Sequence, residues 1–169
     1  MAKELTELRV FQMAEELADA VWKLVEGWNH FAKSTVGEQL VRSSDRVGAT
    51  ISEAHGRYHF GEKLQFIYYA RGSLYETRFW LRQAYKRKLM TQEDGQTFAK
   101  LLEPLALAIN NFANSIRDLR TSTTLKESRA EYIVNRPITN LPITNSETDD
   151  IFTKEDISWL KNLTDENES

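Results

Sequence analysis

The sequence predicts an all-α fold, an antiparallel up-down four-helix bundle followed by a low-complexity acidic C-terminal tail. Apolar residues recur at alternating spacings of four and three along four segments, which is the period of a helix packed nearly parallel to its neighbours. No comparable run alternates apolar and polar residues with period two, so we expect no sheet. Short breaks separate the four segments, which is typical of antiparallel neighbours in a bundle.

The four apolar stripes predict the four helices in order. They cover residues 10–31, 40–54, 67–84 and 98–119. The breaks between them carry helix-boundary signals: Ser34 and Thr35 offer caps before the second helix, and Gly56 and Gly61 bracket the turn before the third.

Two signals concern the fourth helix. Residues 91–94, from Thr91 to Asp94, form a capping-box pattern that opens it. Pro104 lies inside its stripe, and an interior proline costs roughly 3 kcal/mol in a regular helix. We therefore expect a kink or a local break near Pro104.

Charge divides the 169-residue chain into two parts. Residues 1–120 hold 17 basic and 15 acidic residues, net +2, and residues 121–169 hold 5 and 10, net −5. All seven glycines and 15 of the 18 aromatic residues precede residue 121, so the tail lacks material for a core of its own. We expect a bundle domain at 1–120 and a mostly disordered linker at 121–149, whose first dozen residues prolong the last helix.

The end of the tail carries a weak helix signal at 154–163. Thr153 and Asp156 have capping spacing, and Ile157, Leu160 and Leu163 share one side of the segment. Two interpretations stay open. The segment frays or docks on its own bundle, or it is a partner-binding motif.

The third predicted helix carries the strongest chemical signal. Residues 42–88 hold ten basic and four acidic residues, net +6, and arginines and tyrosines share a face turned away from the core stripe. Arginine binds phosphate with two parallel hydrogen bonds, and aromatic rings stack on unpaired bases. The candidate nucleic-acid-binding residues, the basic strip, are Arg71, Tyr75, Arg78, Arg82, Lys86, Arg87 and Lys88. The same composition suits a subunit interface or a solvated surface.

The sequence offers few groups of residues that could act in catalysis or bind a metal. The chain has no cysteine, and its three histidines are His30, His55 and His59, with no carboxylate pair at metal-binding spacing. We predict no catalytic residue, no metal and no cofactor, and hence no enzyme. No long apolar run or leader pattern appears, so we expect a cytoplasmic protein with no membrane partner.

Three segments resemble the motifs of the four helix bundle protein family, also called the 23S rRNA intervening-sequence (S23-type) proteins. They are residues 39–57, 63–77 and 8–14. The resemblance covers about residues 5–120. It implies an antiparallel bundle that assembles into a ring-like homopentamer. A related protein is the accessory variability determinant of diversity-generating retroelements, a basic barrel that binds nucleic acid and a reverse transcriptase. Similarity to it implies RNA or DNA and a reverse transcriptase as partners.

The motif residues are interpreted first as architectural. They are Arg42, Gly48, Glu53, Arg57, Gly72, Ser73 and Glu76. Small residues would let the second and third helices approach closely, and the two glutamates would pair with arginines across that contact, since an unpaired buried charge is costly. From all of this we expect a non-enzymatic homo-oligomer that binds nucleic acid in a ribonucleoprotein. The alternative is a protein-interaction scaffold whose basic strip is a subunit interface.

Overall fold

The structure, a computed structural model, describes residues 4–134 and 151–163, with side chains to residue 122 in the first range. Its elements are η1 (Leu5–Glu7), α1 (Arg9–Glu26), α2 (His30–Ala32), the π-helical turn η2 (Lys33–Gly37), α3 (Glu38–Gly56), α4 (Phe60–Lys86), α5 (Gln92–Val134) and α6 (Lys154–Lys161). No strand occurs in the described ranges, which confirms the all-α prediction.

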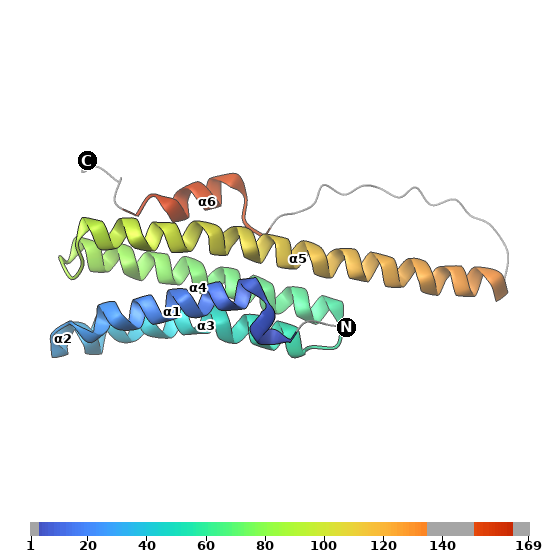
Figure 1. Cartoon of the computed structure of the whole chain (residues 1–169), viewed down its shortest axis with the longest axis horizontal. Helices are drawn as coiled ribbons and strands as arrows, with labels where there is room; N and C mark the ends of the chain where they lie inside the picture. Colours follow the sequence, from blue (N-terminus) through green and yellow to red (C-terminus); the bar gives the residue numbers. More distant parts are fainter. Residues whose placement is uncertain (1–3, 135–150, 164–169) are drawn as a thin grey trace.

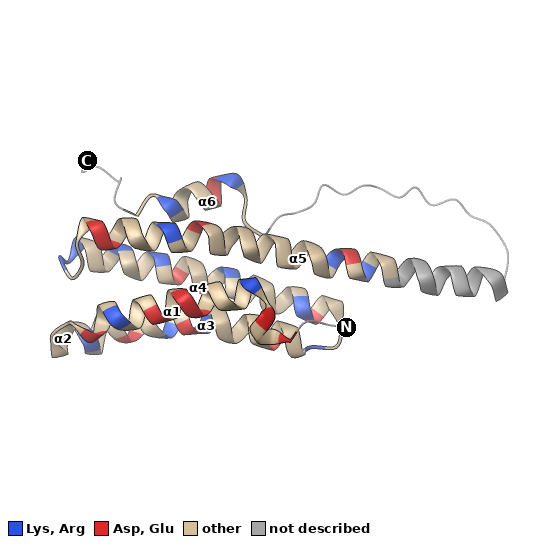
Figure 2. Ribbon diagram, in the orientation of Figure 1, with Lys and Arg blue, Asp and Glu red and all other residues tan. Residues whose placement is uncertain are grey.

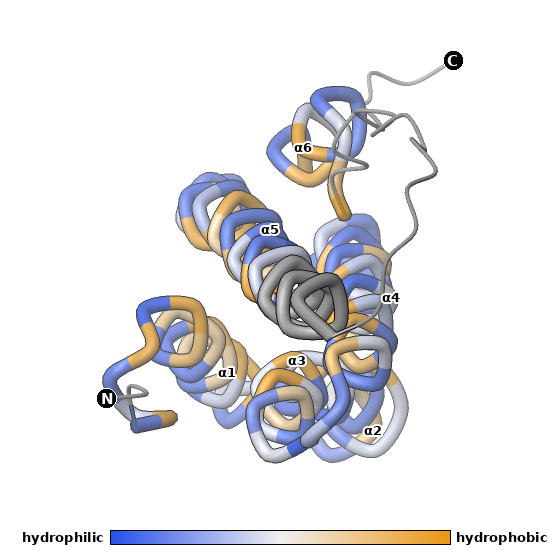
Figure 3. The backbone as a smooth tube through the Cα atoms, turned by 90° about the vertical axis from the view of Figure 1, so that its right-hand side faces the viewer, coloured by the Kyte–Doolittle hydropathy of each residue, from blue (hydrophilic) through white to orange (hydrophobic). Residues whose placement is uncertain are grey.

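Four long helices form the body of the molecule. Successive helices α1, α3, α4 and α5 alternate in direction (Figure 1), and each packs against the next, with α5 closing the ring against α1. The view along the bundle in Figure 3 shows this ring, with α6 lying outside it over α5 and α4. The site described below is this outer layer.

The apolar stripes form the core. Fully buried side chains from all four helices meet there, among them those of Leu17, Leu40, Ile51, Leu74, Leu81, Leu102 and Ile109. The prediction fails at two stripe ends, because Phe31 is 77% and Leu119 is 59% exposed. α1 stops at Glu26, and α5 runs beyond the other helices (Figure 1), where residues 118–122 are all exposed.

The predicted caps of the second helix are wrong. The helical run that leads into α3 starts at His30, because the side chain of Asn29 accepts a hydrogen bond from the backbone N–H of Ala32 at 2.9 Å. The hydroxyls of Ser34 and Thr35 instead donate to the carbonyl of Phe31 inside the helix. An asparagine at this position is a strong N-cap.

The start of α5 follows the prediction, and its middle does not. The Thr91 hydroxyl accepts from the Asp94 N–H at 3.1 Å, and the Asp94 carboxylate accepts from the Thr91 N–H at 2.8 Å, which confirms the capping box. Pro104 does not break the helix, which is continuous across it. Its neighbours Leu102 and Leu105 are fully buried, so packing on the bundle offsets the lost backbone hydrogen bond.

The linker predicted at 121–149 overlaps α5, which extends to Val134. The rest of that segment lies outside the described residues. Within the described ranges, no helix is both long enough and apolar enough to cross a bilayer.

Candidate nucleic-acid interface

The basic strip starts at Arg71, in the first half of α4, and continues just past the end of that helix. Lys86, Arg87 and Lys88 are exposed where α4 ends, and Figure 2 shows basic residues at that end of the bundle. Toward the middle of α4 the strip changes character. Arg71 and Tyr75 are partly buried, and Arg78 is only 1% exposed.

Helix α6 covers the middle of the strip. Asp156, in its first turn, accepts a hydrogen bond from the Tyr75 hydroxyl and lies 3.2 Å from Nη2 of Arg71. The same carboxylate closes a capping box with Thr153, which fixes the start of α6. One acidic residue therefore both caps α6 and docks it on α4.

Arg78 has an unusual environment for a cation. Its Nη2 donates to the backbone carbonyl of Asn162 at 2.9 Å, and its guanidinium lies 3.5 Å from the centre of the Trp159 ring. Its Nε and Nη1 have no hydrogen-bond partner among the described residues. Arg78 therefore receives a cation–π contact and one carbonyl from α6, and no carboxylate ion pair is present there in the described ranges.

Asn110 of α5 holds the segment that leads into α6. Its side-chain amide donates to the Phe152 carbonyl at 2.7 Å, and its carbonyl oxygen accepts from the Phe152 N–H at 2.6 Å. Asn110 is 6% and Phe152 1% exposed. A single buried side chain thus supplies hydrogen-bond partners for both the N–H and the C=O of Phe152.

The apolar side of the tail segment completes the contact. Ile151, Leu160 and Leu163 are between 0% and 5% exposed and belong to the main core cluster. The Tyr75 ring lies against both Phe152 and Trp159, with ring centres 5.8 Å and 5.0 Å apart. Residues 151–163 are therefore packed onto the bundle through apolar contact as well as charge.

The contact shifts three pKa values. Burial, helped by the hydrogen bond to Asp156, raises the pKa of Tyr75 to about 12. Burial, with the nearby charge of Arg82, lowers the pKa of Arg78 to about 10. Burial alone would raise the pKa of Asp156, but the hydrogen bonds from Tyr75, Thr153 and Arg71 outweigh it and hold that pKa below its usual value.

We expect docking of α6 to weaken in acid. The lowered pKa of Asp156 means that its contribution is complete above the ordinary carboxyl value of 3.8 and is lost as the pH falls through the lowered pKa. The raised pKa of Tyr75 leaves the contact intact up to about pH 10. NMR signals of residues 151–163 recorded from pH 2 to 9 should report undocking only at the acid end. Asp156→Asn should remove most of this undocking at low pH. An unchanged pH dependence in that variant would contradict the assignment of the acid transition to Asp156.

The strip was predicted to face outward, and for Arg78 this is wrong. The Arg78 side chain points away from the core stripe, as predicted, but α6 covers that side chain. The acidic tail with its capping pattern was the available signal for this contact. Asn110 was missed, because one polar residue inside an apolar stripe gives no indication of its partner.

The motif residues are mostly on the surface. Glu53 and Glu76 are exposed, so they are not the buried ion-pair partners that were predicted. Gly72 is exposed with open space around it, and a side chain at Gly48 would meet Ala14 of α1 rather than α4. Arg42 pairs with Glu38 on its own helix at 2.6 Å.

The contact between α3 and α4 includes small hydroxyl residues beside its apolar core. Ser73 of the motif is 5% exposed, and the buried Thr77 hydroxyl donates to that of Ser43 at 3.2 Å. Arg57 lies over the Phe66 ring, 4.4 Å from its centre. These contacts fit an architectural role for part of the motif.

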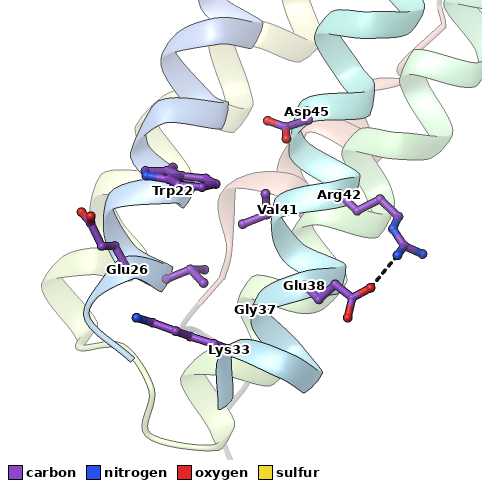
Figure 4. Close-up of a pocket in the computed structure, with 9 residues that line it drawn as sticks. Trp22, Glu26, Lys33, Gly37, Glu38, Val41, Arg42 and Asp45 are labelled. Atoms are coloured by element: carbon purple, nitrogen blue, oxygen red, sulfur yellow. Dashed lines mark hydrogen bonds and ion pairs between the residues drawn. The ribbon is translucent and has the colours of Figure 1, made fainter. Parts of the chain in front are cut away.

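A hollow that contains no residue of the strip lies between α1 and the η2–α3 segment. It has a volume of about 690 Å³ and is lined by Trp22, Val25, Val41 and Gly37 together with charged residues at its edge. Figure 4 shows Trp22 and Val41 facing one another across it, with the Arg42–Glu38 pair at one side. The Trp22 side chain is 61% exposed. No group of three potential metal ligands occurs within the described ranges.

The fold and this surface define a class: a helical bundle with a basic helix face that is partly covered by the tail of the same chain. The 23S rRNA-intervening sequence protein family model matches residues 6–111, and the chain belongs to this family. No curated protein matches the chain. The family match covers α1 through the first half of α5 and stops before α6.

Proposed function

We propose that the protein is a non-enzymatic, oligomeric nucleic-acid-binding protein, an accessory factor of a ribonucleoprotein, with the basic strip of α4 as its binding surface. The observation that carries this proposal is the concentration of charge on that helix. Residues 71–88 hold six basic residues and one acidic residue, and three of the basic ones are exposed together at its end. The family's description links its members to 23S rRNA, which makes RNA the first ligand to test.

Such a surface binds by phosphate contact. Lysine and arginine displace condensed counterions from the backbone, so affinity falls steeply as salt rises. The aromatic residues of α4 add stacking surfaces, since Tyr68 is 50% and Phe79 47% exposed. The homopentamer and the reverse transcriptase partner remain predictions from the family resemblance.

Replacing Lys86, Arg87 and Lys88 by Gln should weaken RNA binding at low salt and reduce its salt dependence. Each phosphate contact removed lowers the slope of log K against log salt by about 0.7–0.9, so a loss of about two to three units is expected if all three residues contact phosphate. Fluorescence anisotropy with a labelled RNA hairpin, at several salt concentrations, measures both quantities.

The matched control removes the same charge elsewhere. Arg9→Gln, Lys23→Gln and Lys33→Gln change three exposed basic residues on the α1 side. This variant should keep most of the affinity and the slope. Equal losses in the two triple variants would show that net charge, not the strip, drives binding, and salt-insensitive or absent binding by the unaltered chain would exclude the function.

A second candidate function is a protein-interaction scaffold. The observation that favours it is α6 itself, which shows that the surface of α4 and α5 accepts an amphipathic helix. A chain that forms multimers by light scattering, yet binds no RNA at low salt, would fit this function.

A further inference from the structure

Helix α6 and the residue that follows it contact the two arginines of the strip that are best suited to bind phosphates. Arg71 and Arg78 are seven residues apart on α4, two helical turns or about 10 Å along one face. Asp156 engages Arg71, and Trp159 and the Asn162 carbonyl engage Arg78. A nucleic acid cannot reach the guanidinium group of Arg78 while α6 is in place, because Arg78 is only 1% exposed. The Arg71 side chain is 37% exposed, but Asp156 occupies its Nη2.

Docked α6 leaves some buried hydrogen-bond donors of the two arginines without partners. Nε and Nη1 of Arg78 and Nε of Arg71 are buried without hydrogen-bond partners within the described ranges. A buried cation that lacks an anionic partner is costly, as is each orphaned donor. The docked state therefore carries a penalty that is largest at Arg78, since Arg71 has Asp156 as an anionic partner and lacks a partner only at Nε.

Other contacts of α6 offset that penalty. Asn110 satisfies both backbone groups of Phe152, and Leu160 is fully buried. Docking is thus favoured by apolar burial and the Asn110 contact and opposed at Arg78. An incoming phosphate would supply the missing anion, with oxygens that accept from several guanidinium N–H groups at once.

Asp156 already stands where such an anion would bind. Its carboxylate accepts from both Tyr75 and Arg71, as a phosphate oxygen would. An acidic group of the chain and a phosphate group of a ligand would therefore exclude one another at this position.

The connection to α5 keeps α6 available after release. Residues 135–150 lie outside the described part, and their number alone sets the reach. A chain of sixteen residues spans up to about 55 Å. The 24 helical residues between Asn110 and Val134 cover about 36 Å, so this connection is long enough to return from Val134 to the docking position beside Asn110. A tethered segment rebinds at a high effective concentration, of the order of millimolar for a short connection.

From these contacts we propose that α6 is a tethered latch on the basic strip, displaced when the phosphate backbone of a nucleic acid takes its place on Arg71 and Arg78. This inference rests on the proposed function and adds its regulation. The latch sets a threshold: weak or sparse phosphate contacts fail to open it, and a structured RNA that also engages Lys86, Arg87 and Lys88 opens it.

The absence of native cysteine allows a direct measurement on the full chain. Gln96 on α5 and Ser158 on α6 are both exposed, so Gln96→Cys with Ser158→Cys accepts a donor and an acceptor dye without disturbing the core. A labelled chain that also carries Asn110→Ala provides the signal of the released tail. The probe is an unlabelled RNA hairpin, added while energy transfer and RNA binding are both recorded.

We expect energy transfer to fall toward the released value in proportion to RNA bound, and to recover when salt removes the RNA. RNA binding with unchanged energy transfer would overturn the latch and leave the proposed function standing. No RNA binding, even by the Asn110→Ala chain in low salt, would overturn both.

Discussion

Asn110→Ala is expected to release α6 from the bundle while leaving the bundle folded. The substitution leaves the N–H and C=O of Phe152 buried and unpaired, at a cost of about 1–3 kcal/mol for each group. The summed loss of about 2–6 kcal/mol is of the size expected to hold a short tail segment. Alanine is a better helix former than asparagine, so α5 itself should not suffer.

Hydrogen exchange measures this effect segment by segment. Amides of residues 151–163 should lose protection in Asn110→Ala, whereas those of α1, α3 and α4 should keep theirs. Asn111→Ala is the matched control, because Asn111 is the exposed neighbour on the same helix. Equal protection of the tail in both variants would show that Asn110 does not hold it.

Leu105→Ala is expected to have the largest effect on the bundle itself. Leu105 is fully buried on α5, and a leucine-to-alanine change in a well-packed core costs about 2–5 kcal/mol, from lost apolar burial and from the cavity left behind. Urea unfolding followed by circular dichroism should show a lower midpoint with a similar slope.

Leu107→Ala separates core packing from a general effect of leucine loss. Leu107 lies one half-turn away on the same helix and is 46% exposed. Its replacement should change the free energy of unfolding by well under 1 kcal/mol. If Leu107→Ala is as damaging as Leu105→Ala, the burial pattern assigned to α5 is wrong.

The helices and the core could be read from the sequence because both depend on local period. The stripe of α4, from Ile67 to Ala84, is fully buried along its length. Helix ends were harder, since they depend on competition between caps. Asn29 was hidden in an apolar stripe that continued past it, and the packing around Pro104 outweighed the penalty that proline carries in isolation.

The site was only half accessible to sequence reasoning. The angular position of Arg71 and Arg78 on their helix follows from helical period, and so does their distance from the core stripe. The presence of α6 over these arginines does not follow from helical period, because the contact joins residues about 80 positions apart and requires the tail to fold back along α5. The opposite charges of tail and strip indicated attraction, but not that Arg78 would be buried without an anion.

The ratio of RNA dissociation constants between the unaltered chain and Asn110→Ala tests the central claim most directly. If α6 and phosphate compete for the strip, releasing α6 should tighten RNA binding about tenfold for each 1.4 kcal/mol of docking free energy removed. Asn111→Ala should bind as the unaltered chain does. Equal or weaker binding by Asn110→Ala would contradict the claim that the tail restrains the basic strip.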